Sequence, residues 1–131
     1  MNKLIRFQEF IDSRGILNVL EFENEFDFLI RRVYYMYGVT DGESRGFHGH
    51  RNLKQLIVCI NGTVDLLIDD GKKSTTISLK NRNEGVLIDY PAWRELHNFT
   101  EETILLVFAS EVYDQDDYIT DYEEFLSYVK K

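Results

Sequence analysis

The apolar residues of this 131-residue chain are gathered in short runs of strand length, and turn residues separate one run from the next. Such runs are typical of β-strands, whereas a convincing helical spacing occurs only near the end of the sequence. Aromatic residues make up 14% of the chain and there is one proline, which also favours strands. The runs predict strands at Ile16–Phe22, Arg31–Tyr37, Leu53–Ile60, Thr63–Asp69, Ser74–Leu79, Gly85–Ile88 and Thr103–Ala109.

Turn residues indicate how some of these strands are connected. Asn61-Gly62 and Asp69-Asp70-Gly71 are types that tolerate the positive φ of tight hairpins. They predict an antiparallel meander through Thr63–Asp69, in which residues 64, 66 and 68 are apolar and should form one buried face.

Near the end of the chain, Tyr118–Val129 has apolar residues at spacings of three and four. This spacing predicts an amphipathic helix that packs against the barrel exterior or a second subunit. The acidic stretch of residues 114–117 just before it is interpreted as a solvated loop and helix N-terminus.

Length and charge limit the class of protein. A chain of 131 residues corresponds to one domain, which we expect to span 1–131. With 15 basic and 23 acidic residues the formal charge is −8, which argues against nucleic acid as a partner. The single cysteine, Cys59, lies in an apolar run and predicts a buried thiol in a reducing cytoplasm. No signal peptide or membrane-spanning run is recognised, so no membrane partner is expected.

Polar residues suited to chemistry cluster in the middle of the chain. His48 and His50 are two positions apart, so in an extended segment their imidazoles leave the same face and share one space. Glycines and Arg45 flank the pair, and the third histidine, His97, follows a Trp-Arg-Glu-Leu segment. Histidines beside arginines and aromatic rings suit a polar ligand.

The spacing of these residues resembles the first motif of the cupins. Gly42, His48, His50, Gln55 and Gly62 occur at the motif's intervals, but Gln55 stands where metal-binding cupins have glutamate. In the second motif Gly85 and Pro91 fit, Trp93 replaces a glycine, and His97 comes one residue late. A slip of one residue turns a strand side chain to the opposite face. The resemblance therefore implies a mainly β cupin jelly-roll barrel with a C-terminal helix, without a metal or other cofactor.

More closely, the sequence is similar to the cupins that act as dTDP-4-keto-6-deoxyglucose 3,4-ketoisomerases (WxcM-like sugar isomerases). The similarity covers nearly the whole chain. It is carried by Asp12-Ser13-Arg14-Gly15, Arg32-Val33-Tyr34-Tyr35, Arg45-Gly46-Phe47-His48-Gly49-His50, Gln55, Asp69-Asp70-Gly71, Pro91-Ala92-Trp93, His97-Asn98-Phe99 and Ala109-Ser110-Glu111.

The resemblance implies an isomerase that moves a keto group from C4 to C3 of a dTDP-linked 4-keto-6-deoxy sugar through an enediol or enediolate. Histidine suits this because both of its protonation states are accessible near neutral pH. The family comparison suggests His50 as the main base and His48 as its partner, although the sequence does not fix this division. The oxyanion needs hydrogen-bond donors, for which Arg45, Tyr35 and the second imidazole are candidates.

Other residues are expected to hold the substrate. Arginine suits phosphate oxygens, so Arg14, Arg32, Arg45 and Arg94 are candidates for the diphosphate. Aromatic rings can stack on the base or line the sugar pocket, and alternation predicts that one of Tyr34 and Tyr35 faces the cavity. The expected substrate-binding set is Arg14, Arg32, Tyr37, Gln55, Trp93, Arg94 and His97.

A homodimer is also implied by the resemblance, since a small barrel has edges to cover. Three alternatives stay open at this point. These are a nucleotide-sugar 3,5-epimerase, a sugar-nucleotide-binding cupin without catalysis or one that assists a partner acyltransferase, and a metal-dependent dioxygenase.

Overall fold

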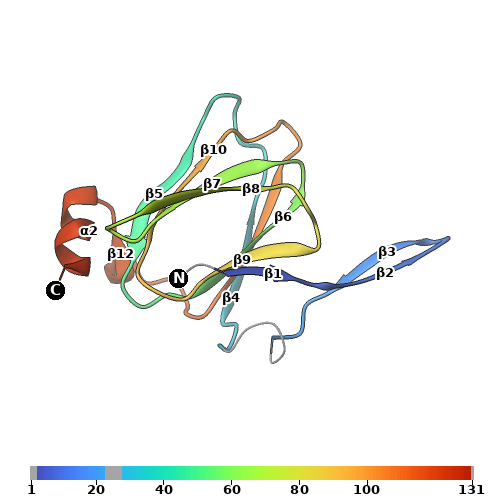
Figure 1. Cartoon of the computed structure of the whole chain (residues 1–131), viewed down its shortest axis with the longest axis horizontal. Coiled ribbons are helices and arrows are strands. Elements are labelled where there is room, and N and C mark those ends of the chain that lie inside the picture. The colour runs from blue at the N-terminus through green and yellow to red at the C-terminus, as the bar shows by residue number, and fades with distance from the viewer. Residues whose placement is uncertain (1–2, 23–27, 131) are drawn as a thin grey trace.

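The computed structural model describes residues 3–22 and 28–130. These residues lie mainly in strands, and helix α2 lies near the end of the chain (Figure 1). The strands are β1 (Lys3–Arg6), β2 (Gln8–Asp12), β3 (Gly15–Val19), β4 (Arg32–Met36), β5 (Arg45–His50), β6 (Gln55–Asn61), β7 (Val64–Asp69), β8 (Ser74–Leu79), β9 (Glu84–Ile88), β10 (Trp93–His97), β11 (Ile104–Ala109) and β12 (Tyr118–Ile119). A 3₁₀ turn at Gln115–Asp117 precedes β12, and helix α2 spans Tyr122–Val129.

The strands form two five-stranded sheets that face each other, and a separate hairpin. One sheet has the order β1-β9-β6-β11-β4 and the other β12-β5-β10-β7-β8. All pairs within them are antiparallel. The prediction of a mainly β jelly-roll barrel with a C-terminal helix is confirmed.

The connection between β6 and β7 differs from the predicted meander. The two strands belong to different sheets, so Asn61-Gly62 carries the chain across the barrel and does not close a hairpin. Gly62 has φ of 69°, and a Cβ there would lie 2.5 Å from the Thr100 hydroxyl oxygen. Close packing against the 100–103 turn thus requires glycine at this crossing. The predicted hairpin at Asp69-Asp70-Gly71 is confirmed, because β7 pairs with β8.

The predicted strands are found, but several others were missed: β1, β2, β5, β10 and β12. The strands β5 and β10 are rich in charged and polar residues because their inner face borders a cavity, so they lack an apolar alternation. Helix α2 begins at Tyr122, four residues later than predicted, because Tyr118–Ile119 pairs with β5 and Asp121 caps the backbone NH of Glu124 at 3.0 Å.

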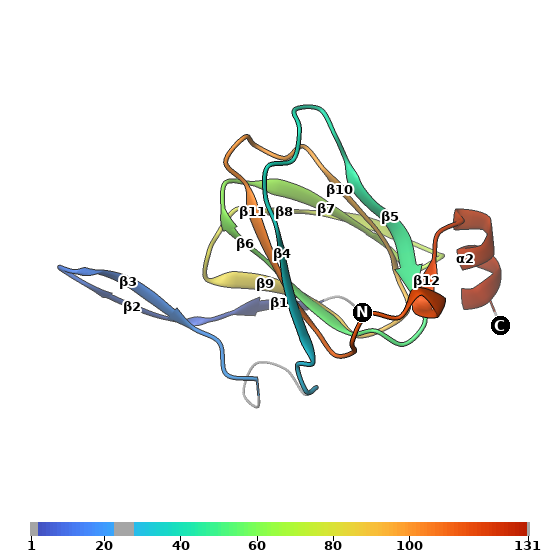
Figure 2. The same ribbon diagram turned by 180° about the vertical axis from the view of Figure 1, so that it is seen from behind.

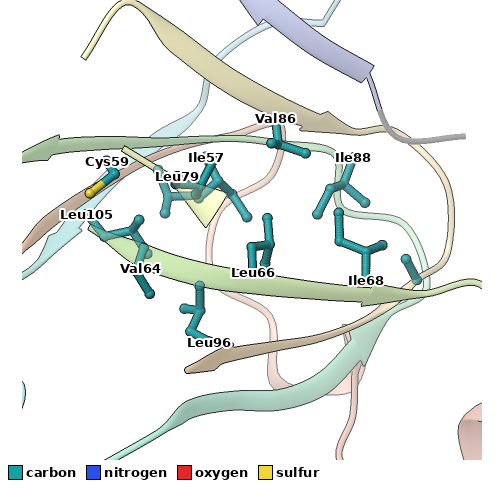
Figure 3. Close-up of a cluster of buried hydrophobic side chains, with 12 residues drawn as sticks. Ile57, Cys59, Val64, Leu66, Ile68, Leu79, Val86, Ile88, Leu96 and Leu105 are labelled. Carbon is teal, nitrogen blue, oxygen red and sulfur yellow. The ribbon is translucent and has the colours of Figure 1, made fainter. Parts of the chain in front are cut away.

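The main core lies between the two sheets and is aliphatic (Figure 3). Ile57, Val86 and Leu105 come from one sheet and pack with residues of β7 from the other. In β7 every second residue, Val64, Leu66 and Ile68, is buried, which confirms the predicted buried face. A smaller cluster joins Trp93, Ile119 and Phe125, so helix α2 covers the outside of the second sheet.

The β2–β3 hairpin projects away from the sheets at the end opposite helix α2 (Figures 1 and 2). Its apolar side chains Phe10, Ile11, Ile16 and Leu17 are exposed. Within the described ranges, 3–22 and 28–130, no helix has the length and apolar character needed to cross a membrane.

Candidate active site

A cavity of about 350 Å³ lies between the two sheets, a volume at the lower end of the range for small-molecule sites. Part of its lining is apolar and comes from both sheets: Met36, Ile57, Leu66, Leu96, Leu105 and Val107. The rest is glycine at Gly46 and the polar or aromatic residues Arg32, Tyr34, Arg45, His48, Gln55, Arg94 and Tyr118. Among the described residues the lining includes three arginines and no carboxylate, so the cavity favours an anion.

A bulge in β5 brings Arg45 and His48 to the same cavity, although residues three apart on a regular strand face opposite sides. Arg94 pairs with His48, but the next residue of β10 pairs with Gly46, so one residue of β5 is left over. That residue is Phe47, with φ of 60°. Gly46 has φ of 93°, and a Cβ there would lie 2.9 Å from a backbone oxygen of β10. The bulge, which Gly46 permits, therefore directs both the Arg45 guanidinium and the His48 imidazole into the cavity.

The two neighbouring histidines have different environments. Their ring centres are 4.8 Å apart at nearly right angles, and both rings pack against Tyr118, at 5.0 Å for His48 and 4.4 Å for His50. The predicted convergence of the imidazoles is confirmed. His48 lines the cavity, whereas His50 is 1% exposed and is not part of the lining. Of the two imidazoles, His48 is thus the one that lines the cavity.

His50 is held from behind by Asp117, a residue that the sequence did not identify. The His50 Nδ1 atom lies 2.8 Å from Asp117 Oδ2, and both side chains are buried. Asp117 Oδ1 accepts hydrogen bonds from the backbone NH groups of Arg51 at 3.1 Å and Asn52 at 2.6 Å. The prediction that the acidic stretch is solvated is confirmed for residues 114–116, which are exposed, and is wrong for Asp117, which is buried. No local signal in the sequence links Asp117 to a histidine 67 positions earlier in the chain.

This contact fixes the tautomer of neutral His50. Because a carboxylate only accepts, Nδ1 carries the hydrogen and Nε2 keeps its lone pair. The Nε2 atom is buried and has no hydrogen-bond partner among the described residues. His50 is therefore oriented as a neutral group with a free basic nitrogen beside His48.

The surroundings keep both histidines unprotonated at neutral pH. Burial, together with the nearby Arg94 cation, lowers the pKa of His48 to about 4. Burial and the same cation also lower the pKa of His50, while the Asp117 carboxylate acts in the opposite direction. Both imidazoles are therefore in the neutral form, which can accept a proton, as a general base must.

Arg94, Gln55 and Tyr34 form a directed chain of hydrogen bonds along the cavity. The Arg94 guanidinium donates to Gln55 Oε1 and, at 3.0 Å, to the Ala92 carbonyl oxygen. The Gln55 amide then donates from Nε2 to the Tyr34 hydroxyl oxygen at 2.8 Å. Since this oxygen already accepts, the Tyr34 hydroxyl hydrogen is left to donate toward a ligand. Burial raises the pKa of Tyr34, which keeps the hydroxyl protonated.

Of the predicted site residues, the structure brings Arg32, Arg45, His48, Gln55 and Arg94 together around the cavity. The prediction that one of two adjacent tyrosines faces it is confirmed, and the inward one is Tyr34. The assignments of Tyr35 and Tyr37 to the site are corrected. Tyr35 lies on the outer face of β4 and stacks on Tyr37, which follows the end of that strand; the two are 65% and 69% exposed. Strand alternation turns Tyr35 away from the cavity.

Trp93, His97 and Arg14 also lie outside the cavity, which corrects three further assignments. Trp93 packs under helix α2 against Tyr122 and Phe125. On the outer face of β10, His97 lies 2.8 Å from both the Ser44 hydroxyl and a Glu95 carboxylate oxygen.

Arg14 lies in the turn of the β2–β3 hairpin, where it is paired with Asp12 at 2.7 Å and its side chain is 88% exposed. The one-residue displacement of His97 in the second cupin motif explains its outward direction, since its neighbour Leu96 lines the cavity instead.

The residues present do not fit the metal site of metal-binding cupins. Among the described residues, no three His, Cys, Asp or Glu side chains are grouped so that they could hold an ion. Gln55 occupies the glutamate position of the motif and its oxygen is engaged by the Arg94 guanidinium. We therefore derive no chemical step through a metal.

A jelly-roll barrel with an anion-favouring cavity and a neutral histidine defines an acid–base site of the cupin type. The family model described as "FdtA: WxcM-like, C-terminal" matches residues 1–130, and the chain belongs to this family. It is 39% identical over 130 residues to a TDP-4-oxo-6-deoxy-alpha-D-glucose-3,4-oxoisomerase of Aneurinibacillus thermoaerophilus, covering 99% of this chain and 94% of that protein.

Solved structures give the same relationship. A 3,4-ketoisomerase from Helicobacter canadensis is 37% identical with a TM-score of 0.95, covering 99% of this chain and 98% of that one. The sugar 3,4-ketoisomerase QdtA from Thermoanaerobacterium thermosaccharolyticum, solved in complex with TDP, is 37% identical with a TM-score of 0.94, covering 98% and 94%. A dTDP-4-dehydrorhamnose 3,5-epimerase from Bacillus anthracis is 19% identical with a TM-score of 0.78, covering 89% and 76%, and shares the fold alone.

Proposed function

We propose that this chain is a cofactor-independent 3,4-ketoisomerase that moves the keto group of a TDP-linked 4-keto-6-deoxyhexose from C4 to C3. Relatives with this activity match almost the whole chain. The observation that carries the proposal is a neutral imidazole, His48, in an arginine-lined cavity between the sheets. The imidazole can act as the base that this reaction needs, and the arginines can stabilise the negative charge that develops.

The isomerisation requires no net oxidant or reductant. A base removes the hydrogen of C3 as a proton, the C–H electrons form a C3=C4 double bond, and the C4 carbonyl oxygen becomes an enediolate oxygen. A proton then returns to C4, the proton of the C3 hydroxyl passes to the C4 oxygen, and the C3 oxygen becomes the carbonyl oxygen. Each proton removed is balanced by one delivered, so one base that can also act as an acid is sufficient.

We assign these steps to particular side chains of the cavity. His48 removes the C3 proton and delivers a proton to C4, and the His50–Asp117 pair orients and supports it from behind. The Tyr34 hydroxyl, with its hydrogen free, donates to a substrate oxygen. Arg32 and Arg45 bind the diphosphate, for which a planar guanidinium is well suited. This assignment replaces His50 with His48 as the group that touches the substrate.

Proton exchange in deuterated water tests the proposed reaction. The purified protein, treated with a chelator, is incubated with TDP-4-keto-6-deoxyglucose and the sugar is followed by NMR. We expect exchange at C3 and a 3-keto product whose C4 carries deuterium. Deuterium at C5 would instead support an epimerase, and binding without exchange at any carbon would support a non-catalytic sugar-nucleotide protein.

The low pKa of His48 predicts an unusual pH dependence. The base is active when neutral, so kcat/KM falls only as the pH drops through the pKa of His48 in the free enzyme. This pKa is about 4 in place of the usual 6.5. We expect activity to hold through pH 5.5 and to decline near pH 4, with circular dichroism confirming that the fold persists. A decline centred on pH 6.5 would contradict the assigned environment of His48.

The same proposal includes a homodimer in the cytoplasm. An isolated two-stranded hairpin is only marginally stable in water, and the β2–β3 hairpin exposes Phe10, Ile11 and Ile16. The edge strand β4 also exposes Val33 and Tyr35 on its outer face. A second copy would cover both surfaces. Sedimentation at twice the mass of the chain supports the dimer, and sedimentation at the single mass rejects it.

A further inference from the structure

We infer that Arg94 is the fixed cation that stabilises the enediolate, and that Gln55 keeps this cation available because an amide, unlike a carboxylate, does not neutralise it. The inference rests on the proposed function and adds to it a charge-stabilising residue and the residue that preserves its charge. Arg94 of β10 and Gln55 of β6 contact each other beside His48.

Arg94 is a buried cation without an anionic hydrogen-bond partner among the described residues. Its side chain is 3% exposed, and its hydrogen bonds go to the neutral oxygens of Gln55 and Ala92. Its Nε atom is buried and has no partner in the described part of the chain. The acidic group near Arg94 is the Asp117 carboxylate, and its oxygens already accept hydrogen bonds from His50 and from two backbone NH groups.

Leaving a charge buried and unpaired is costly, so proteins retain such groups where a ligand or reaction supplies the opposite charge. Burial lowers the pKa of Arg94 to about 10, so the guanidinium is still protonated at neutral pH. The proposed reaction creates one negative charge, on the enediolate oxygens. A fixed cation that is itself buried, as Arg94 is, stabilises that charge more than it stabilises the neutral ketone.

The position of Arg94 suits this role. It pairs directly with His48 across β10 and β5, and both side chains line the cavity. Directly opposed residues on one face of a sheet are close neighbours. The cation therefore lies beside the base, where the C3 proton is removed and the negative charge develops.

Gln55 makes hydrogen bonds to two neighbouring side chains at once, one through each atom of its amide group. Its Oε1 accepts from Arg94 and its Nε2 donates to the Tyr34 oxygen at 2.8 Å. Glutamate has nearly the same shape, but as a carboxylate it would cancel the charge of Arg94 and could not donate to Tyr34. The amide at this position thus leaves the positive charge directed at the cavity.

The test is the Gln55→Glu variant, with Gln8→Glu on the exposed strand β2 as a control of identical chemistry. All samples contain EDTA, so that the new carboxylate cannot recruit a metal ion. We expect kcat for TDP-4-keto-6-deoxyglucose to fall at least tenfold, with KM changed less than threefold. The pKa of His48, measured by NMR titration without substrate, should rise by about one unit. The thermal midpoint should not fall.

Two results would overturn the inference: kcat within twofold of wild type, or an unchanged pKa of His48. If Gln55→Glu does not fold, Arg94→Lys and Arg94→Leu replace it. The lysine variant should keep a higher kcat and a lower pKa of His48 than the leucine variant, and equal values would overturn the inference. Wild-type protein that turns over no 4-keto sugar would refute the proposed function instead, while the titration still tests the charge.

Discussion

Replacing His48 with asparagine is expected to lower kcat by about 10²- to 10⁴-fold, the usual contribution of a general base. Asparagine keeps a polar group of similar size in the cavity but cannot accept and return a proton at neutral pH. The fold should persist, because His48 lines the cavity and is not part of the aliphatic core. Turnover is measured by NMR of the product, and the secondary structure by circular dichroism.

His97→Asn is the matched control for this experiment. It removes the same type of side chain from the outer face of β10, where His97 contacts Ser44 and Glu95 and not the cavity. We expect this variant to retain most of the wild-type activity. If His48→Asn retained more than a tenth of the activity while His50→Asn abolished it, the base would be His50 and our assignment would be wrong.

The second large effect is expected from Asp117→Asn. An amide has one acceptor oxygen, and the backbone NH groups of Arg51 and Asn52 require it, so the NH₂ group of the new amide would face His50 Nδ1 and donate to it. His50 then shifts its hydrogen to Nε2 and loses the free lone pair beside His48. We expect kcat to fall on the order of 10²-fold, since a wrong histidine tautomer impairs acid–base catalysis.

The same substitution should also reduce stability. A weakened buried hydrogen-bond network lowers the free energy of unfolding by about 1–3 kcal/mol. Urea denaturation gives this change, and Asp116→Asn is the control, because that neighbour is exposed and only its backbone contacts Arg51. An Asp117→Asn variant with wild-type stability and turnover would show that the His50–Asp117 contact has no role.

Strand periodicity gave reliable information about local geometry. Alternation correctly predicted the buried face of β7, the shared direction of His48 and His50, and the opposite directions of Tyr34 and Tyr35. It did not reveal β5 and β10, because a strand that borders a polar cavity does not alternate between apolar and polar residues. It also did not reveal the bulge at Phe47, which depends on the pairing of β5 with β10.

Family resemblance and side-chain chemistry together identified most of the polar residues around the cavity, namely Arg32, Arg45, His48, Gln55 and Arg94. It could not tell which tyrosine faces inward, and it placed Trp93 and His97 in the site although they lie on the other side of β10. A motif records which residue types recur along a chain. The direction of each side chain is set by the register of its strand.

Local properties of the chain, such as strand alternation, turn chemistry and the spacing of the histidine pair, were determined by the sequence, because they depend on residues within a few positions of one another. The tertiary structure decided the rest. It brought Asp117 to His50 across 67 positions and Arg94 to Gln55 across 39. These long-range pairings depend on how the two sheets pack against each other. The same packing decided that His48, and not His50, lines the cavity.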